Sequence, residues 1–514
     1  MNRTLQEIIR KILPFILFIG ILFFVFTRVT YLFREVSISR DNITGFSDEG
    51  EMDVVCIGAS TMVEYYQPLT AWEKYGFTSY AYATIYGQFD LYWRYIDKVL
   101  ETHNPELFVI DIRMITAMDE EVNESGLRFW TDSLPMLSLA RYASLNDYLD
   151  MHSLEEKTDA MSYYIDIAKY HTNTLALSSP ENWKYIDNKR GSKYKGHELS
   201  SVHHFFEEPV VNTEEMAELS QMQSQALYHL LDYCKEKDLN ALFVVCPYIV
   251  KEEEQKVYNT VKGIVESYGY NYINANEYYE EMDFDFTTDI KNVNHVNCIG
   301  AEKYTVFLGN YITNTYEIPT HRGEDSYSQW DADSQVFSEA LCASKEEIYQ
   351  TIKDKYAAAE LAESIKKTED LYEWLSWAKN PNYSLVVCAS MKDGSFGDIE
   401  IADKQCLEDS GIDVNKKVNC LRISSGEEII FTEESEESIS YSGWLGELDG
   451  MPLVICEVNM EDEIELNVGG REVSFSGDGI YLTLVNNNFK EVIDCVGIDE
   501  NTDGTINMIR MKNK

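Results

Sequence analysis

Basic residues are scarce in this chain. Its 514 residues include 43 Lys and Arg against 88 Asp and Glu, which gives a formal net charge of −45. Proteins bind the phosphate backbone of a nucleic acid through Lys and Arg, so this charge argues against a nucleic-acid partner. It also argues against docking on anionic lipid through a broad basic face.

Cysteine and proline are scarce too, with 10 of each. So few cysteines do not make a disulfide scaffold, and no CxxC or Cys/His spacing indicates a zinc site. Hydrophobic residues make up 45% of the chain and aromatic residues 13%, which excludes a largely disordered protein. We therefore expect a folded protein with reduced, mostly buried thiols, and we predict neither a metal nor a cofactor.

One long apolar run is present, over residues 12–26 (ILPFILFIGILFFVF). Extended over residues 8–33, it reaches the roughly 20 residues that a membrane-spanning helix needs. A cleaved signal peptide is the competing interpretation, but no small-residue cleavage site follows the run. Residues 1–40 hold six basic and two acidic residues, so almost all of the acidic excess lies beyond them. We predict a single-pass signal-anchor in the cell membrane, with the bulk of the chain extracytoplasmic.

The pattern of apolar and polar residues divides the rest of the chain into regions. Four short apolar runs alternate with helical patterns, which is typical of buried parallel strands in an α/β protein. The runs cover residues 54–57, 107–110, 241–245 and 272–273, and the helical patterns cover 89–102, 213–237 and 300–313. We predict a three-layer α/β sandwich with a central parallel sheet, followed by a separate C-terminal β-rich sandwich. The expected divisions are an anchor (1–35), a spacer (36–52), an α/β domain (53–318), an acidic helical linker (319–365) and a β-rich domain (366–514).

Ser60 follows the first apolar run directly, in the sequence Gly58-Ala59-Ser60. Ligand sites of α/β sheets lie at the carboxyl ends of the strands, so a hydroxyl placed there is a candidate functional group. By itself the motif is weak, because a Ser after a strand is commonly a helix N-cap. A second candidate, His295, comes just before a helical pattern for which Asn297 is a plausible N-cap.

Several segments together resemble the SGNH/GDSL hydrolase superfamily, in the order of that family, over residues 46–318. The closer resemblance is to its membrane-anchored branch, which includes the D-alanyl transfer protein of lipoteichoic acid synthesis and polysaccharide O-acetyltransferase-like proteins. The matching pieces are GAS at 58–60, YGQ at 86–88, PELFVID at 105–111, YH at 170–171, LFVVCPY at 242–248 and NHVNCIGAEKYT at 294–305.

The resemblance implies roles for individual residues. Ser60 would be the nucleophile and His295 its general base, because a serine hydroxyl is a weak nucleophile until a base takes its proton. The N–H groups of Ser60 and Gly87 would form the oxyanion hole. The family's acidic residue, three positions before the histidine, is Asn292 in this chain, and Asp289 is an alternative orienting group.

The implied function is that of an esterase or O-acyltransferase acting on a cell-envelope or extracellular polysaccharide, with a membrane-bound acyl-transfer protein as a conceivable partner. Asn292 motivates the alternative. An amide orients the imidazole but supplies no charge to the imidazolium, and the Asp-to-Asn change in a serine triad lowers turnover by about four orders of magnitude. The alternative is therefore a catalytically degenerate assembly or glycan-binding factor.

The C-terminal region has a weaker resemblance of its own. LYEW at 371–374, NYSLVVC at 382–388, Lys392-Asp393, NVGG at 467–470 and GIYLTLVN at 479–486 resemble the lectin-like domain of the interleukin-like EMT inducer (ILEI). That resemblance implies carbohydrate contact, and a purely structural β module is an equally open interpretation. Two motifs remain, the His203-His204 pair and an acidic loop over residues 499–510. We interpret the histidine pair as structural, because adjacent side chains on an extended chain point to opposite faces. We interpret the loop as a polar β-turn rather than a calcium site, because it ends in Arg510 instead of the Glu that an EF-hand requires.

Overall fold

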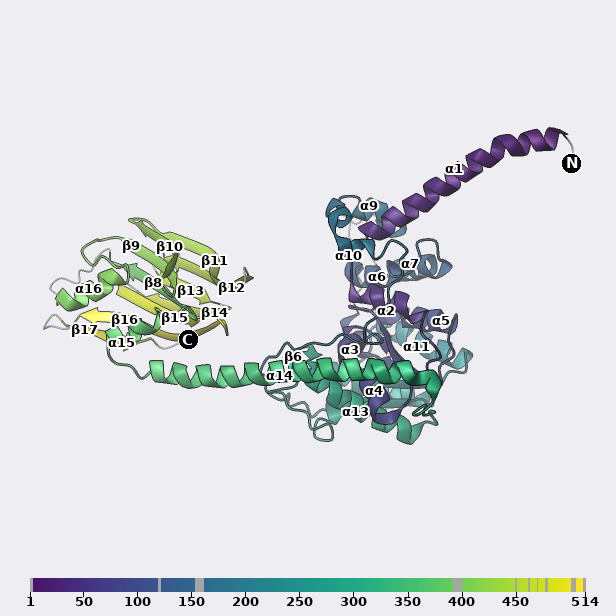
Figure 1. Cartoon of the computed structure of the whole chain (residues 1–514). Helices are drawn as coiled ribbons and strands as arrows, with labels where there is room; N and C mark the ends of the chain where they lie inside the picture. The colour runs from purple at the N-terminus through teal and green to yellow at the C-terminus, as the bar shows by residue number, and fades with distance from the viewer. Residues whose placement is uncertain are drawn as a thin grey trace. The chain divides into compact units, whose positions relative to one another are not determined.

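The computed structural model forms two compact units, Met1–Thr351 and Ile352–Lys514. The structure describes residues 3–118, 122–152, 161–391, 399, 401–448, 451–460, 463–468, 470–476, 479–500 and 505–511. The first unit is an α/β fold and the second is mainly antiparallel β (Figure 1). The predicted division into an α/β region and a C-terminal β region is therefore confirmed.

A parallel sheet of five strands, in the order β2-β1-β3-β4-β5, forms the centre of the first unit. The strands are β1 (Val54–Gly58), β2 (Ser79–Ala83), β3 (Leu107–Asp111), β4 (Ala241–Val245) and β5 (Asn271–Asn274). The four apolar runs correspond to β1, β3, β4 and β5, whereas the sequence analysis missed β2. Its sequence, SYAYA, alternates tyrosine with small residues and lacks the Val/Ile run typical of a buried parallel strand. Because β1 lies between β2 and β3, the chain winds in opposite directions from β1, which makes its carboxyl end a topological switch point.

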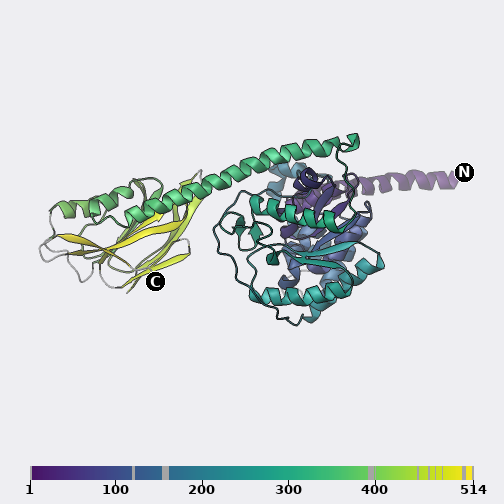
Figure 2. The same ribbon diagram turned by 90° about the horizontal axis from the view of Figure 1, so that it is seen from below.

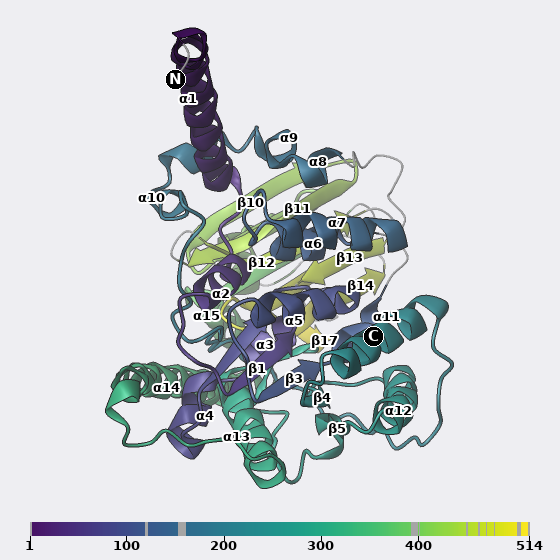
Figure 3. The same cartoon turned by 90° about the vertical axis from the view of Figure 1, so that its right-hand side faces the viewer.

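Helices cover both faces of this sheet (Figures 2 and 3). On one face α3 (Ser60–Tyr65), α4 (Pro68–Tyr75) and α13 (Cys298–Thr315) enclose a core with every second residue of β1. On the other face lie α5 (Tyr92–Leu100), α11 (Gln221–Glu236) and α12 (Glu252–Ser267). The helix predicted over 213–237 begins only at Gln221, because Ser220 and Gln223 form a capping box there. Residues 213–220 are not helical.

Helix α1 (Arg3–Phe33) contains the only segment among the described residues, Ile12–Phe33, that is long and apolar enough to cross a membrane. Its mean hydropathy is 2.5, and a signal sequence would have the same properties. Side chains at residues 12–26 are exposed, whereas Leu32 and Phe33 are buried against the first unit. The last turn of α1 contacts α9 (Asp166–Tyr170), η3 (Thr174–Ser178) and α10 (Pro180–Trp183).

The segment predicted to be a spacer, residues 36–52, is partly helical. It contains helix α2 (Ile38–Phe46), whose N-cap Ser37 accepts a hydrogen bond from the Arg40 backbone N–H. Phe46 packs its ring on Tyr80 and Tyr82, at centroid distances of 5.0 and 4.8 Å. The sequence analysis did not predict this helix, because its buried face includes the polar residues Arg40 and Asn42.

Shorter elements complete the first unit. They are η1 (Phe89–Leu91), η2 (Arg113–Ala117), α6 (Glu124–Thr131), α7 (Leu139–Met151), α8 (Met161–Tyr164), η4 (Ala275–Glu277), β6 (Ile290–Asn292), β7 (His295–Val296) and η5 (Asp325–Tyr327). The segment predicted as an acidic helical linker contains one helix of 38 residues, α14 (Ser328–Ile365). The boundary between the two units falls within it, and its first half packs on the first unit through Trp330, which lies 5.4 Å from the ring of Trp72.

The second unit is a β-sandwich with two helices. A six-stranded antiparallel sheet, β10-β9-β8-β15-β16-β17, packs on a four-stranded sheet, β11-β12-β13-β14, around an apolar core. The strands are β8 (Tyr383–Ser390), β9 (Asn419–Ser425), β10 (Glu428–Ser435), β11 (Ile439–Leu448), β12 (Met451–Met460), β13 (Glu463–Val468), β14 (Arg471–Ser476), β15 (Gly479–Asn486), β16 (Glu491–Glu500) and β17 (Ile506–Arg510). Helices α15 (Leu371–Trp377) and α16 (Ile401–Asp409) cover the other face of the larger sheet. Lys392, Asp393, Gly469 and residues 501–504 of the acidic loop lie outside the described residues.

Candidate active site

Ser60 lies at the carboxyl end of β1, as the first residue of α3. The N-cap of this helix is Ala59, which has an extended backbone (φ −106°, ψ −153°) and makes no side-chain cap. The Ser60 hydroxyl is therefore free of the capping role that a Ser after a strand commonly has. Its Oγ instead lies 2.8 Å from Nε2 of His295, a residue 235 positions away in the sequence.

His295 lies on a two-stranded hairpin, in which β6 and β7 pair Asn292 with His295. The hairpin leads directly into α13, whose N-cap Asn297 accepts hydrogen bonds from the backbone N–H groups of Ile299 and Gly300. Because the N-cap fixes the start of the helix, the short hairpin before it has little freedom. The imidazole is thus held at the sheet edge next to Ser60.

Asn292 contacts the other side of the imidazole. Its Oδ1 lies 3.1 Å from His295 Nδ1 and also accepts the backbone N–H of Asn294 at 2.9 Å. An amide oxygen only accepts, so this contact assigns the ring proton to Nδ1 and leaves Nε2 to accept the proton of Ser60. Ser60, His295 and Asn292 therefore form a hydrogen-bonded chain with the geometry of a serine triad.

Asp289 is not part of that chain. Its carboxylate accepts hydrogen bonds from Lys303 Nζ (2.8 Å), the Asp285 backbone N–H (2.8 Å) and the Thr288 hydroxyl (2.7 Å). Its backbone carbonyl accepts the N–H of Asn297 at 2.9 Å. Among the described residues none of its hydrogen bonds reaches His295, so its geometry fits a support beneath the start of α13 rather than an orienting group.

The sequence analysis assigned no role to Arg113, which clamps the loop that carries His295. Its two Nη atoms donate to the carbonyl and the side-chain oxygen of Asn294, at 2.5 and 2.9 Å. The guanidinium also stacks on the ring of Tyr248, with its Cζ 3.6 Å from the centroid, and the Tyr65 hydroxyl donates to the same carbonyl at 2.8 Å. The position of Arg113 just beyond β3 is the only signal of this role in the sequence.

Burial, together with the nearby cations Arg113 and Lys291, lowers the pKa of His295 to about 4. The ring is therefore neutral at pH 7 and able to accept a proton. The same surroundings make the imidazolium unfavourable, because both neighbouring charges are positive and the Asn292 amide is neutral. The site thus has the layout of a serine triad with a weak base.

Asp111, at the end of β3, has a buried carboxylate at this edge of the sheet. It accepts hydrogen bonds from the hydroxyl of Thr61, the residue after Ser60, and from the backbone N–H of Arg113 at 3.1 Å. Burial raises its pKa, although these hydrogen bonds oppose the shift. Asp111 therefore ties the turn after β1 to the turn after β3, and does so through the residue that follows Ser60.

Gly87 lies against the end of β1. A Cβ at this position would lie 2.8 Å from the carbonyl oxygen of Gly58 and 3.2 Å from Cα of Ala59, so no side chain fits. The preceding Tyr86 has a left-handed backbone, with φ +52°. The N–H of Gly87 makes a long hydrogen bond to the carbonyl of Thr84, at 3.2 Å. The Ser60 N–H belongs to the first turn of α3, where backbone donors have no partner within the helix.

The histidine pair has ordinary structural roles. His203 Nε2 lies 2.7 Å from the carbonyl oxygen of Thr287, and His204 Nδ1 lies 2.6 Å from that of Lys291. Within the described residues, no group of three or more His, Cys, Asp or Glu side chains has a metal-binding arrangement. All ten cysteines are free thiols, and only Cys342 is exposed.

Comparisons with known proteins do not name a family. No family model matches the chain, and no curated protein matches it.

Proposed function

We propose that this chain is a membrane-anchored, extracytoplasmic esterase or O-acyltransferase of SGNH type, acting on a cell-envelope or extracellular polysaccharide. One observation carries the proposal: Ser60 Oγ lies 2.8 Å from His295 Nε2, while Nδ1 of the same ring contacts Asn292. The strand order β2-β1-β3-β4-β5 supports it, because this order places Ser60 at the switch point of the sheet.

The chemistry would proceed through an acyl-enzyme. Ser60 Oγ attacks the ester carbonyl while its proton passes to His295 Nε2. The oxyanion that forms accepts hydrogen bonds from the backbone N–H groups of Ser60 and Gly87. Collapse of the tetrahedral intermediate breaks the ester bond, and the leaving alkoxide takes the proton from Nε2. A water molecule or a sugar hydroxyl then gives its proton to Nε2 and attacks the acyl carbonyl. Collapse of this second tetrahedral intermediate breaks the bond between the acyl group and Ser60 Oγ, and Oγ takes the proton back from Nε2. Water as the acceptor makes an esterase and a sugar hydroxyl makes a transferase.

Features of the second unit support a glycan substrate. Between its larger sheet and α15 and α16 lies a cleft of about 660 Å³, lined by charged and aromatic side chains that include Tyr372, Lys379, Asp409 and Arg422. Sugar hydroxyls are bound by polar side chains beside an aromatic surface. The cleft is therefore a candidate glycan site, in accord with the lectin-like resemblance of the sequence.

The alternative function, a non-catalytic assembly or glycan-binding factor, rests on Asn292 and on the lowered pKa of His295, about 4. A fluorophosphonate probe separates the two proposals, since it reacts only with an activated serine. We expect the intact chain to be labelled at Ser60, as located by peptide mass spectrometry. Ser60→Ala should remove the label, whereas Ser47→Ala, at an exposed serine, should retain it. An unlabelled wild type that still binds polysaccharide would favour the alternative.

Membrane attachment is tested separately. We expect the protein to stay in the membrane fraction after a carbonate wash and to keep its first residues, because residues 12–33 are long enough to span the bilayer. External protease should digest the chain beyond about residue 45 in intact cells, at the length that a spanning helix uses. Release of a soluble form that begins near residue 30 would show a cleaved signal sequence instead.

A further inference from the structure

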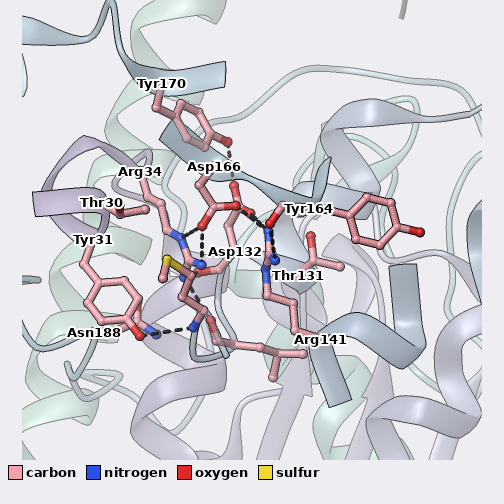
Figure 4. Close-up of polar contacts among 12 residues, drawn as sticks. Thr30, Tyr31, Arg34, Thr131, Asp132, Arg141, Tyr164, Asp166, Tyr170 and Asn188 are labelled. Atoms are coloured by element: carbon pink, nitrogen blue, oxygen red, sulfur yellow. Dashed lines mark hydrogen bonds and ion pairs between the residues drawn. The ribbon is translucent and has the colours of Figure 1, made fainter. Parts of the chain in front are cut away.

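Helix α1 is joined to the first unit at its last turn (Figure 4). Arg34, the residue after the helix, is buried and donates to Asp166 Oδ2 through Nε (3.0 Å) and Nη2 (2.6 Å). Arg141 donates to the other carboxylate oxygen of Asp166, and Phe33 packs in an apolar cluster with Ala176 of η3. Because a buried ion pair is costly to break, the course of α1 fixes how the first unit lies at a membrane.

Further buried arginines reinforce this joint. The four buried arginines among the described residues, Arg34, Arg40, Arg128 and Arg141, all gather here. Arg40 Nη2 donates to the carbonyl of Tyr31 in α1 at 3.0 Å, and the guanidinium of Arg128 lies over the ring of Tyr170, at 5.5 Å from its centroid. The end of α1 is therefore held by side chains of α2, α6, α7 and α9.

The apolar part of α1 that is free of the first unit is short for a bilayer. Residues 12–26 are exposed, and at about 1.5 Å per residue this stretch extends about 22 Å, whereas the hydrocarbon core is about 30 Å thick. Arg10 and Lys11 set the boundary before it, because charges are costly in hydrocarbon. An undistorted bilayer crossed by α1 would therefore also cover part of residues 27–33, where the helix packs on α9, η3 and α10.

Arg28 marks the boundary on the other side. Its guanidinium lies over the ring of Phe24, with Cζ 4.8 Å from the centroid, and donates to the carbonyl of Ile186 at 3.2 Å. A charged side chain near the end of a spanning helix reaches the headgroup level. Ile186 follows α10, so the surface of the first unit reaches the same level.

Exposed apolar side chains flank α1 at this level. They are Leu137, Leu139, Leu175, Leu177, Trp183 and Ile186, which we call the collar. The collar holds all four exposed leucines that the structure describes outside α1, and Leu175 is 80% exposed. Asn182 Nδ2 donates to the carbonyl of Leu32 at 3.2 Å, and the Met136 N–H donates to the Tyr31 hydroxyl at 3.1 Å. Both parts of the collar are thus tied to the last turns of α1, and α9 and α10 lie at the foot of the helix (Figures 1 and 3).

The chemistry of the collar fits a lipid interface. Tryptophan is enriched there because its ring is apolar and its N–H is polar, and Trp183 Nε1 already donates to the carbonyl of Leu177 at 2.9 Å. The acidic residue of α10, Glu181, pairs with Lys184 at 2.5 Å and with Arg190 at 3.5 Å. Docking through apolar side chains needs no basic face, which accords with the net charge of −45.

We propose that the collar lies in the boundary between headgroups and acyl chains of the bilayer that α1 crosses. The first unit then rests on the membrane instead of standing away from it. The inference rests on the membrane anchoring proposed above and adds a second contact to it. Continuity with a spanning helix selects lipid as the partner of this apolar surface, because the joint at Arg34 holds the collar beside the part of α1 that meets the headgroups.

The first test measures Trp183 in the intact chain, inserted in nanodiscs of phosphatidylcholine with or without bromine on the upper acyl chain. The emission of Trp183 is the difference between the wild type and Trp183→Phe. We expect bromolipid to quench about half of it or more, because an interfacial apolar surface sinks about 5–10 Å into the boundary. Trp444 of the second unit is the matched control, since it is 51% exposed against 48% for Trp183. The emission that Trp444→Phe removes should not be quenched.

The second test uses cysteine labelling in the same nanodiscs. Leu177→Cys and Val336→Cys, both at exposed positions, are placed in a Cys342→Ser background, because the other nine cysteines are buried. A polar maleimide should label Leu177→Cys about tenfold more slowly than Val336→Cys, each relative to its rate in urea, since lipid covers only the former. Should Leu177→Cys fail to fold, the quenching of Trp183 decides.

The outcomes separate the collar from the anchor. A chain that leaves the membrane fraction in carbonate would refute the anchor, and the collar with it. A chain that stays there, with Trp183 unquenched and Leu177→Cys labelled as fast as Val336→Cys, would overturn the collar alone. Protection of Leu177→Cys in native membranes but not in nanodiscs of the purified chain would assign the collar to a protein partner and overturn the lipid proposal.

Discussion

Two polar groups of the α/β unit, the half-buried His295 at the sheet edge and the buried Arg34 at the end of α1, differ in what lies beside them. His295 contacts a neutral amide and lies near two cations, so its neutral form is favoured. Arg34 contacts the carboxylate of Asp166, which Arg141 shares. A carboxylate, the partner that a catalytic histidine ordinarily has, is thus present at the end of α1 and absent beside the imidazole. Charge thus fixes the end of α1 in the first unit, whereas neutral hydrogen bonds alone orient the ring of His295.

The largest expected effect tests the missing charge. Asn292→Asp keeps the shape of the side chain and its two hydrogen bonds, and it puts a carboxylate beside Nδ1. We expect kcat for p-nitrophenyl acetate to rise by about 10- to 10,000-fold, the inverse of the loss caused by Asp-to-Asn changes in serine triads. Asn314→Asp, at an exposed position of α13, adds the same charge and should leave kcat unchanged. An unchanged rate in Asn292→Asp would mean that this site does not carry the activity.

Loss of the ion pairs that Asp166 makes with Arg34 and Arg141 should lower the free energy of unfolding strongly. Asp166→Asn leaves Arg34 and Arg141 buried without their shared carboxylate, and removal of one partner of a buried pair costs about 3–5 kcal/mol. Asp147→Asn breaks the partly exposed pair with Arg94 and should cost about 1 kcal/mol or less. Denaturant unfolding of the intact chain in detergent compares the two variants. Equal losses of unfolding free energy in the two variants would show that Asp166, Arg34 and Arg141 do not form a buried ion-pair network in solution.

Ser60→Ala should have a smaller effect on the wild type than on a complete triad. In subtilisin, removal of the whole triad lowers kcat by a factor of about 2 × 10⁶, and removal of the aspartate alone lowers it by about 3 × 10⁴. The serine and histidine without the aspartate therefore still contribute a factor of about 10². We expect a loss of about 100-fold in Ser60→Ala, and the complete loss of any gain when Asn292→Asp is combined with it. Melting temperatures of the variants check that the fold is retained. Equal rates for Ser60→Ala and the wild type would support the non-catalytic function.

The lowered pKa of His295 predicts a pH dependence of stability. Its folded value of about 4 lies below its ordinary value of about 6.5, so the unfolded chain binds more protons between these two pH values. The contribution is fully present above pH 6.5 and is lost as the pH falls through 4, by about 3 kcal/mol at pH 4. Comparison of His295→Gln with the wild type, by denaturant unfolding from pH 7 to pH 4, isolates this share. If the unfolding free energies of the two proteins changed with pH in the same way, the lowered pKa of His295 would be refuted.

Arg113 should have the smallest effect, on rate rather than on binding. Arg113→Ala removes the clamp on Asn294, and we expect kcat to fall about tenfold with KM little changed, because the histidine loop loses its fixed position. The pH midpoint of kcat/KM should move upward from about 4, since a cation near His295 is lost. Arg113→Lys keeps the charge without the two-pronged contact, so it should keep the midpoint and not the rate. A merely structural role would leave the midpoint unmoved in both variants.

Several parts of the fold follow from local sequence. The Val/Ile runs of β1, β3 and β4 mark buried parallel strands, and Asn297 at the start of α13 is the predicted N-cap. The prediction failed where burial is set by neighbours. Strand β2 lacks the apolar run, and α2 buries Arg40 and Asn42, which donate hydrogen bonds to Asn188 and to the carbonyl of Gly196, far away in the sequence. Pattern-based reasoning treats such residues as solvent-exposed, which is why residues 36–52 were predicted to be a spacer.

The sequence by itself determined the acidic character of the chain, its apolar N-terminal helix, the alternation of strands and helices, and the three-residue spacing between Asn292 and His295. These are local properties, because they depend on residue type and on neighbours within a few positions. Only the tertiary structure decided that Ser60 meets His295 across 235 positions, that Asp289 supports α13 and that four arginines gather at the end of α1. Such contacts depend on the order of the strands and on the packing of distant helices. No spacing within one segment encodes them.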